Sequence, residues 1–200
     1  VIFSPELGTL IFDAITYFLT MLILFNKPFN VVCQFSAHEK HPTLKNFIDF
    51  PNVYAAGRLD TDSEGLLILT DDGALQHRLS HPKHKEIKIY WVQVEGNPSD
   101  SDLEPLLTGV SLGDFVTQPA QVRIINAPKN LWPRIPPIRE RKAIPTTWLE
   151  IKIEEGKNRQ VRRMTAKVGF PTLRLIRYAI GSYSIDDIAV GEYQKLKSEI

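Results

Sequence analysis

The residues with the clearest chemical potential lie in segment 57–65, which has the sequence GRLDTDSEG. In an extended segment Arg58 and Asp60, two positions apart, point to the same side. A fixed cation keeps a neighbouring loop carboxylate ionised, and an ionised carboxylate can attack a sugar carbon as a nucleophile. Asp60 is therefore a candidate nucleophile. The alternative is that the acidic residues only cap and turn a surface loop.

The same segment also allows a calcium site, because its acidic residues alternate. Asp60, Asp62 and Glu64 loosely match the first, third and fifth positions of an EF-hand loop. Such a loop needs a helix on each side. Pro51 interrupts the sequence upstream, and Leu66–Leu69 downstream predicts a strand. The calcium interpretation is therefore the weaker of the two chemical ones.

A basic cluster occupies segment 155–164, EGKNRQVRRM. The pattern predicts a helix over Arg159–Gly169 with Asn158 as its N-cap. Four basic residues at positions i, i+3, i+4 and i+8 would share one face of that helix: Arg159, Arg162, Arg163 and Lys167. A row of like charges repels itself unless anions such as phosphates meet it. The alternative is that these bases pair with nearby acids such as Glu154 and Glu155.

Tyr90 lies in the middle of segment 85–94, KEIKIYWVQV, which is strongly strand-like. Most tyrosines in strands are half-buried packing residues, and the pattern alone favours that role. A tyrosine on a strand can also offer a stacking face and a phenol to a nucleobase.

Charge is distributed unevenly along a chain that is close to neutral. The 200 residues carry a net charge of +1, with 43% apolar and 24% charged residues, as in ordinary globular proteins. From Leu131 to Ile180, however, there are twelve Lys and Arg against four Asp and Glu, a net of +8. A basic block inside a neutral chain favours a polyanion partner, and a solvated charged face is the alternative.

The sequence gives little indication of a membrane protein, a secreted protein or a metal-binding protein. The apolar run Leu10–Phe25 is interrupted by Asp13 and is shorter than a bilayer span, and no basic residue precedes Lys27 as a signal peptide would need. Cys33 is the only cysteine, so no internal disulfide can form, as expected for a protein of the cytoplasm. No Cys/His cluster has zinc-site spacing. We expect no membrane association.

Strands mixed with a few helices predict an α+β fold with a largely antiparallel sheet. Segment 126–145 holds five prolines and must be irregular, and such a long loop is usually functional. The expected strands are Met21–Phe25, Leu66–Thr70, Lys85–Val94, Thr147–Ile153 and Leu173–Tyr178. The expected helices, besides the basic one, are His41–Phe50, Ala74–Ser80 and Ser99–Gly109.

Taken together, these motifs resemble those of the RsuA-like bacterial pseudouridine synthases. Segment 57–65 resembles the family's signature loop, Lys88-Ile89-Tyr90 its tyrosine strand, segment 155–164 its third motif, and segment 173–181 (LRLIRYAIG) the strand that follows. The order matches, and the resemblance covers roughly Met21 to Glu192. Segments 134–141 and 144–149 are similar to a loop of the RluE-type members, which act on the large ribosomal subunit.

The resemblance implies an enzyme that isomerises a uridine of ribosomal RNA, in the large subunit, to pseudouridine without cofactor or metal. By the resemblance, Asp60 attacks the anomeric carbon of the sugar, and Tyr90 stacks on the target base and helps to remove a proton. Arg162 matches the family's basic partner and would hold Asp60 ionised and oriented. The implied fold is the pseudouridine synthase catalytic fold, a largely antiparallel mixed sheet with flanking helices and loops.

The resemblance also implies how RNA is held. The target base is flipped into a basic cleft, and Arg58, Arg159, Arg163, Lys167, Leu175 and the loop 134–142 are the expected contacts. Residues 21–200 would form one catalytic domain, with residues 1–20 a segment of unclear role. We expect a cytoplasmic monomer whose partner is ribosomal RNA.

The alternative to the enzyme is an RNA-binding module that has kept the fold and lost the chemistry. Binding alone would not require Asp60, Tyr90 and Arg162 together, so their presence favours the enzyme.

Overall fold

The computed structural model describes residues 20–80, 86–139, 141 and 143–197. Within these residues nine strands form one mixed sheet, whose main path runs β5-β6-β4-β7-β3-β1-β9, with β2 paired to β3 and β8 to β7. The strands are β1 Met21–Lys27, β2 Tyr54–Ala55, β3 Glu64–Thr70, β4 Lys88–Glu95, β5 Gln121–Ile125, β6 Thr146–Ile153, β7 Thr172–Ile180, β8 Tyr183–Ser184 and β9 Tyr193–Lys197. The helices are α1 Gly73–Ser80, α2 Asp100–Thr108 and α3 Gln160–Lys167, with a 3-10 turn η1 Leu44–Asn46.

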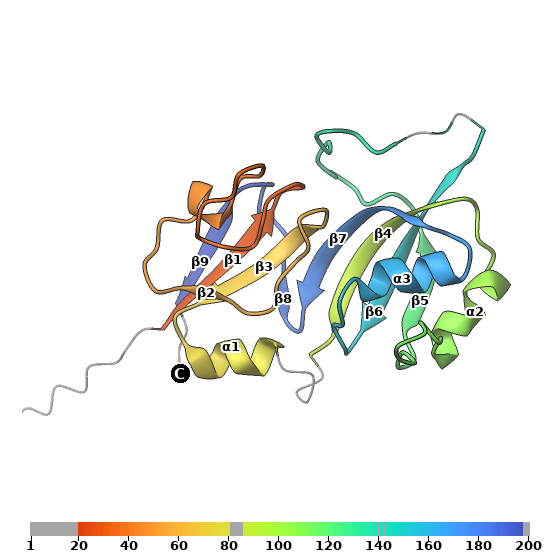
Figure 1. Ribbon diagram of the computed structural model, residues 1–200, viewed down its shortest axis with the longest axis horizontal. Coiled ribbons are helices and arrows are strands. Elements are labelled where there is room, and N and C mark those ends of the chain that lie inside the picture. Colours follow the sequence, from red (N-terminus) through yellow and green to blue (C-terminus); the bar gives the residue numbers. More distant parts are fainter. Residues whose placement is uncertain (1–19, 81–85, 140, 142, 198–200) are drawn as a thin grey trace, which may run out of the picture.

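The sheet consists of two halves that meet at a short parallel junction. Figure 1 shows β9, β1, β2 and β3 with α1 in one half, and β7, β4, β6 and β5 with α2 and α3 in the other. Strands β3 and β7 pair in parallel over two residues, with Glu64 opposite Ile176 and Gly65 opposite Arg177, whereas the other named strand pairs are antiparallel. The predicted α+β class with a largely antiparallel sheet is confirmed.

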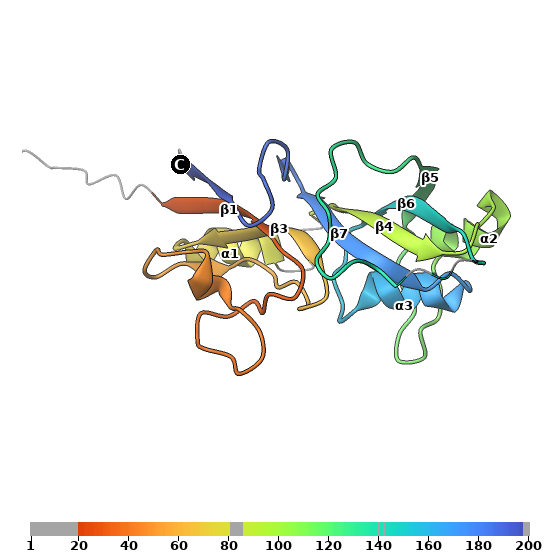
Figure 2. The same ribbon diagram turned by 90° about the horizontal axis from the view of Figure 1, so that it is seen from above.

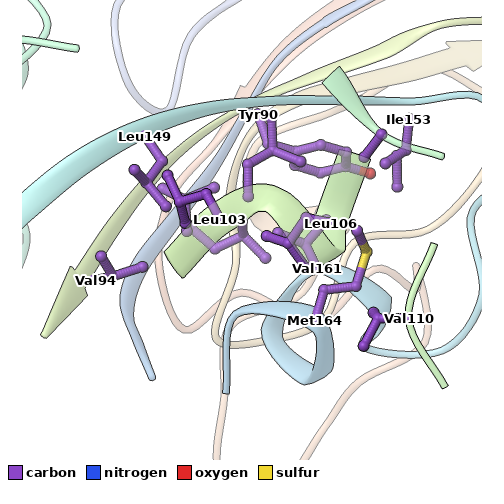
Figure 3. Close-up of a cluster of buried hydrophobic side chains, with 13 residues drawn as sticks. Tyr90, Val94, Leu103, Leu106, Val110, Leu149, Ile153, Val161 and Met164 are labelled. Carbon is purple, nitrogen blue, oxygen red and sulfur yellow. The ribbon is translucent and has the colours of Figure 1, made fainter. Parts of the chain in front are cut away.

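Both faces of the sheet are covered by apolar clusters. Strand β3 is buried along its whole length, as the sequence GLLIL would require of a central strand. Alternate residues of β3 enter different clusters, Leu66 and Ile68 with α1 on one face and Leu67 and Leu69 with the 44–53 segment on the other. In the second half, α2 and α3 pack against β4 and β6, and Figure 3 shows Tyr90 in this cluster beside Leu103 and Val161.

Two of the helix predictions need correction. Segment His41–Phe50 forms only the 3-10 turn η1, whose Leu44 is buried in the apolar cluster, and Ile48 packs in the same cluster just after the turn. The basic helix begins at Gln160, and Arg159 stands before it in the left-handed region with φ 50°. Arg159 therefore does not belong to the expected helical row.

The helix expected over Ser99–Gly109 is confirmed as α2, which begins after the N-cap Ser99. Its Pro105 is exposed and removes the backbone donor of one helical hydrogen bond, which this helix tolerates.

The proline-rich segment is irregular, as predicted, and its position is fixed by side chains. Arg134 donates from Nε to the carbonyl of Pro136 and from Nη2 to that of Pro137, both at 2.9 Å. Trp132 donates from Nε1 to Glu64 Oε1 at 2.8 Å, which ties this loop to the start of β3. Residues 140 and 142 lie outside the described residues.

The question of a membrane span can be examined only for the described part of the chain, where no helix is both long and apolar enough to cross a bilayer. Residues 1–19, which carry most of the apolar N-terminal run, lie outside it.

Candidate active site

A pocket of about 490 Å³ opens where the two halves of the sheet meet. The loop between β2 and β3 forms one wall, β4 and β7 form the floor, and the segment before α3 closes the other side. Many of the residues named from the sequence line this pocket: Arg58, Asp60, Tyr90, Arg159 and Leu175. A concave site at the meeting of two structural units is a usual place for a ligand.

Asp60 lies on the β2–β3 loop, and backbone hydrogen bonds to the carbonyls of Asp60 and Thr61 hold this loop in place. The amide of Ser63 donates to the carbonyl of Asp60 at 3.1 Å, and the amide of Asn30 donates to the carbonyl of Thr61 at 2.8 Å. Leu59 is buried and anchors the loop from below. The Asp60 side chain keeps 36% of its surface exposed, so its carboxylate remains accessible from the pocket.

Arg177 also lines the pocket, and the sequence reasoning did not single it out. It is 4% exposed on β7, and its Nε donates to the carbonyl of Leu66 at 2.8 Å. Its two terminal nitrogens donate to the carbonyls of Arg58 and Gly57 at 3.5 and 3.4 Å. One buried guanidinium thus connects β7 with both ends of the loop that carries Asp60. A signal was present, because an arginine inside an apolar strand is rarely buried without a specific partner.

Arg159 makes the shortest cationic contact with Asp60. Its Nη1 lies 3.5 Å from Asp60 Oδ2, and its guanidinium holds Asp62 in two hydrogen bonds, at 3.0 and 2.7 Å. The left-handed conformation at Arg159 turns its side chain toward this loop. Arg159 was expected to contact phosphates, and in the structure it bridges the two aspartates.

Arg162 contacts the same loop through Asp62. Its Nη2 donates to the backbone carbonyl of Asp62 at 2.6 Å, and its Nε lies 3.5 Å from Asp62 Oδ2. Burial lowers the pKa of Arg162, and the charges of Asp62 and Asp60 oppose that shift. The guanidinium thus reaches Asp60 only as a charge at longer range. The contacts of Arg162 with this loop are therefore made to Asp62, and its expected effect on Asp60 stays a prediction.

Asp62 is held in its ionised form. Burial opposes its ionisation, but the hydrogen bonds from Arg159 and the charges of Arg162 and Arg159 outweigh that effect and lower its pKa. Asp62 is thus the counter-ion that positions two arginines beside Asp60.

Tyr90 belongs both to an apolar core cluster and to the lining of the pocket. The side chain is 8% exposed and packs in the cluster with α2 and α3, yet Tyr90 also lines the pocket. Its hydroxyl donates to no group within the described residues, which leaves it available to a ligand. Leu175, on the neighbouring strand β7, is likewise buried and lines the pocket.

Lys88 adds a second buried cation to the pocket. It stands two residues before Tyr90 on β4, on the same face of the strand, and is 8% exposed. Its Nζ donates to the carbonyls of Glu86 and Glu154 at 2.9 and 3.0 Å. Burial and then the charge of Arg177 lower the pKa of Lys88. Lys88 lies in the segment Lys88-Ile89-Tyr90 of the resemblance, but no role was predicted for it.

The other basic residues predicted to contact RNA differ in whether their charged groups are already paired within the protein. Arg58 is exposed, and its guanidinium has no partner among the described residues; the same holds for the ammonium of Lys167 at the end of α3. Arg163 is already paired, with Asp114 and with the carbonyl of Leu112 at 2.8 Å. The alternative of pairing with a nearby acid is therefore realised for Arg163, although the acid is Asp114.

The calcium interpretation is wrong. Glu64 is 1% exposed and turns away from Asp60 and Asp62 to pair with Arg174, with two hydrogen bonds of 2.8 Å. The three acids therefore do not share a site, and no group of three or more residues able to hold a metal ion occurs in the described part of the chain.

This chain is similar in sequence to known pseudouridine synthases. The family model for RNA pseudouridylate synthase matches residues 21–167. "Ribosomal large subunit pseudouridine synthase E" of Xanthomonas axonopodis pv. citri is 59% identical over 84% of this chain and 90% of its own length. The protein of that name from Vibrio vulnificus is 57% identical over 88% of this chain and 74% of its own.

A small-subunit relative and a solved structure extend the comparison. "Ribosomal small subunit pseudouridine synthase A" of Escherichia coli (strain K12) is 35% identical over 88% of this chain and 70% of its own length. A crystal structure of a pseudouridylate synthase superimposes with a TM-score of 0.74 at 30% identity, over 89% of this chain and 70% of the other. These findings confirm the resemblance to the RluE-type members, and the chain belongs to the RNA pseudouridylate synthase family.

Proposed function

We propose that the chain converts a uridine of large-subunit ribosomal RNA to pseudouridine, with Asp60 as the nucleophile. One observation carries the assignment of Asp60. Among the described residues it is the only carboxylate that lines the pocket, where it faces five basic residues: Arg58, Lys88, Lys157, Arg159 and Arg177. A single nucleophilic carboxylate in basic surroundings suits a reaction whose leaving group is an anion.

The chemistry follows from that arrangement. A carboxylate oxygen of Asp60 forms a bond to C1′ of the ribose while the bond from C1′ to N1 breaks, and the electron pair stays with uracil. The detached uracil anion turns, its C5 bonds to C1′, and the bond to Asp60 breaks. The proton on C5 then leaves and N1 gains one, so the product is an isomer of the substrate. The pocket's cations stabilise the uracil anion while it is detached.

Each other residue has a part in this proposal. Tyr90 stacks on the uracil ring and places its hydroxyl near the proton that must leave C5. Leu175 forms the apolar side of the pocket, and Arg162 keeps the Asp60 loop in place through Asp62. Arg177 holds the loop through hydrogen bonds to backbone carbonyls, and Arg159 holds it through its contact with the Asp60 carboxylate.

The RNA substrate is the inferred partner because relatives that are 57% and 59% identical to this chain are named as ribosomal large-subunit enzymes. Removing a base from its stack costs a few kcal/mol. Contacts of Arg58, Lys167 and the 134–142 loop with phosphates would offset that cost. We propose that the enzyme works as a monomer in the cytoplasm, where ribosomal RNA is available.

The test uses ribosomal RNA that lacks the modification. The RNA is incubated with wild-type protein or with Asp60→Asn, and pseudouridine is mapped by carbodiimide-dependent stops in reverse transcription. A new stop in large-subunit RNA, made by the wild type and not by the variant, supports the proposal. A protein that binds this RNA and produces no stop is instead the non-catalytic RNA-binding module.

A further inference from the structure

A second pocket, of about 630 Å³, lies on the other side of the Asp60 loop. It shares the wall formed by Arg58, Leu59, Asp60 and Arg159 with the first pocket. Its remaining lining comes from Thr61, Asp62 and the loop 28–43 that follows β1: Asn30, Val32, Cys33, Gln34 and His41. Figure 2 shows this loop, in orange, projecting from the same side of the sheet as α3. The two pockets are therefore neighbours with the catalytic loop between them.

The 28–43 loop is held rigidly relative to Asp60. The fully buried ammonium of Lys27 donates to the carbonyls of Pro28 and Val31 at 3.0 and 2.8 Å, which fixes the start of the loop. The amide of Val32 donates to the carbonyl of Pro42 at 2.9 Å and closes the loop at its base. The bond from Asn30 to the carbonyl of Thr61 joins the loop to the chain immediately after Asp60. A ligand in the second pocket would thus be positioned by the same framework as the nucleophile.

The 28–43 loop contributes amide and imidazole groups to the second pocket, from Asn30, Gln34 and His41, beside Val32 and Cys33. The Asn30 side-chain amide has no partner among the described residues, and His41 Nδ1 is buried without one. Gln34 uses its Nε2 on the carbonyls of Ser36 and Ala37, which leaves its carbonyl oxygen as an acceptor. Amide and imidazole groups offer donors and acceptors side by side, as recognition of the edge of an unstacked nucleobase requires.

Two further features favour a base over a phosphate as the occupant. Asp60 and Asp62 also line the second pocket and offset the charges of Arg58 and Arg159 there, and carboxylates accept hydrogen bonds from amino groups of bases. The unpaired guanidinium of Arg58 lies at the wall between the pockets, where the phosphodiester linking two adjacent nucleotides would pass.

We propose that the second pocket is a nucleotide subsite that binds the base next to the target uridine, with the Asn30 amide contacting the edge of that base. The proposal rests on the proposed function, because it takes the first pocket as the place of the flipped uridine. It assigns part of the enzyme's sequence preference to the 28–43 loop.

The first test detects occupancy without requiring catalysis. Cys33 is the only cysteine of the chain, is partly exposed and lines the second pocket, so its reaction with iodoacetamide reports on that pocket. The Asp60→Asn protein is alkylated with and without saturating large-subunit ribosomal RNA. We expect the RNA to slow alkylation about tenfold or more. An unchanged rate while the RNA is bound overturns the proposal, whether or not the wild type forms pseudouridine.

The second test asks whether the second pocket recognises a particular base or is only shielded from solvent by the bound RNA. Asn30 and Asn52 both have left-handed backbones, with φ 68° and 61°, so glycine fits at either position without strain. Asn52 is exposed and lines neither pocket, which makes Asn52→Gly the matched control. Both substitutions are made in the Asp60→Asn background. Their dissociation constants are then measured for hairpins that carry the mapped uridine and each of the four bases beside it.

We expect Asn30→Gly to weaken binding of the preferred hairpin about tenfold and to leave the least favoured one nearly unchanged, which flattens the preference. Asn52→Gly should keep the full preference. An equal loss for all four bases would mean a backbone contact and would overturn the proposal. If the wild type makes no pseudouridine but Cys33 is protected by RNA, the proposed function fails while the subsite stands.

Discussion

Asp60 and Asp62 stand two residues apart on one loop, yet their surroundings give them different parts. Asp62 receives two hydrogen bonds from Arg159 and its backbone carbonyl receives one from Arg162. Within the described residues Asp60 has one cationic contact, at 3.5 Å, and it lines the pocket. A carboxylate that is fully hydrogen-bonded is a poor nucleophile, so the loop separates a counter-ion, Asp62, from the proposed nucleophile, Asp60.

The pKa of Asp62 leads to a prediction about acid stability. Since that pKa is lower in the folded protein than in the unfolded chain, the ionised form stabilises the fold. The contribution is complete above the unfolded value of about 4 and is lost as the pH falls through the lower folded value. Asp62→Asn should therefore be less stable than wild type at pH 6, and the difference should shrink below pH 4. Urea unfolding at several pH values measures it; a difference independent of pH would contradict this account.

The variant Tyr90→Phe removes the hydroxyl of Tyr90 and keeps its ring, so it distinguishes the contributions of the two groups. The ring packs in the cluster with α2 and α3, whereas the hydroxyl has no partner within the described residues. The variant should keep its melting temperature and lose about a hundredfold or more in single-turnover rate, the usual effect of losing a proton-transfer group. An unchanged rate would restrict Tyr90 to stacking and packing.

The sequence predicted the members of this site better than their contacts. Asp60, Tyr90, Arg159 and Leu175 do line one pocket. The pairing of Arg159 with the aspartates depends on a left-handed backbone at a non-glycine residue, which helical periodicity does not indicate.

At the scale of elements, the junction between β3 and β7 decides where the catalytic loop lies. Only two residue pairs are formed there, and one of them is Gly65 opposite Arg177. Gly65 has φ 97°, and a Cβ at this position would collide with the backbone of Arg177. Glycine is thus required both for the conformation and for the close approach of the strands.

Gly65→Ala and Gly113→Ala form a matched pair that tests this junction. Gly113 has the same φ of 97°, but a Cβ there meets no atom within 4 Å. Gly113→Ala should cost only the backbone strain, about 1–3 kcal/mol. Gly65→Ala should cost about 1–3 kcal/mol more, because the strands must separate, and it should also slow pseudouridine formation. Denaturant unfolding provides the free energies, and equal losses for the two variants would contradict the proposed collision.

Most of the strands with buried apolar runs were predictable, and the exposed edge strands were not. Strand β5, QVRII, and strand β9, YQKLK, lie at the two ends of the sheet and lack a continuous apolar pattern. Their pairing is set by neighbouring strands and not by their own side chains. The helix predicted over His41–Phe50 is limited to the turn η1, whose Leu44 packs in an apolar cluster with Ile48 just after it.

At the scale of the whole molecule, several arginines of the basic block 131–180 are paired within the fold and are not left to bind an external anion. Arg174 pairs with Glu64, Arg162 with Asp62 and Arg163 with Asp114, while Arg177 binds backbone carbonyls. Charge counting along the sequence therefore overestimates the RNA-facing charge, because it cannot show which arginines are neutralised within the fold.

The salt dependence of RNA binding tests which basic residues are paired within the fold. Each phosphate contact that is lost lowers the slope of log affinity against log salt by about 0.7–0.9. Lys167→Ala should lower the slope by about that amount, because its ammonium has no partner in the described part of the chain. Arg163→Ala should change it little, since Asp114 already holds the guanidinium. Filter binding to large-subunit RNA at several salt concentrations provides both slopes. A larger drop in slope for Arg163→Ala than for Lys167→Ala would contradict the conclusion that Arg163 is neutralised within the fold and Lys167 is not.

The central claim is that Asp60 alone attacks the sugar, and one measurement addresses it directly. Large-subunit RNA labelled with tritium at C5 of uridine releases the label when pseudouridine forms, so single-turnover release follows the chemical step. We expect rapid release by wild type, slowed but measurable release by Asp62→Asn, and a loss of at least about 10⁴-fold for Asp60→Asn, as for other removed nucleophiles. Release by Asp60→Asn within tenfold of wild type would contradict the assignment of Asp60 as the nucleophile.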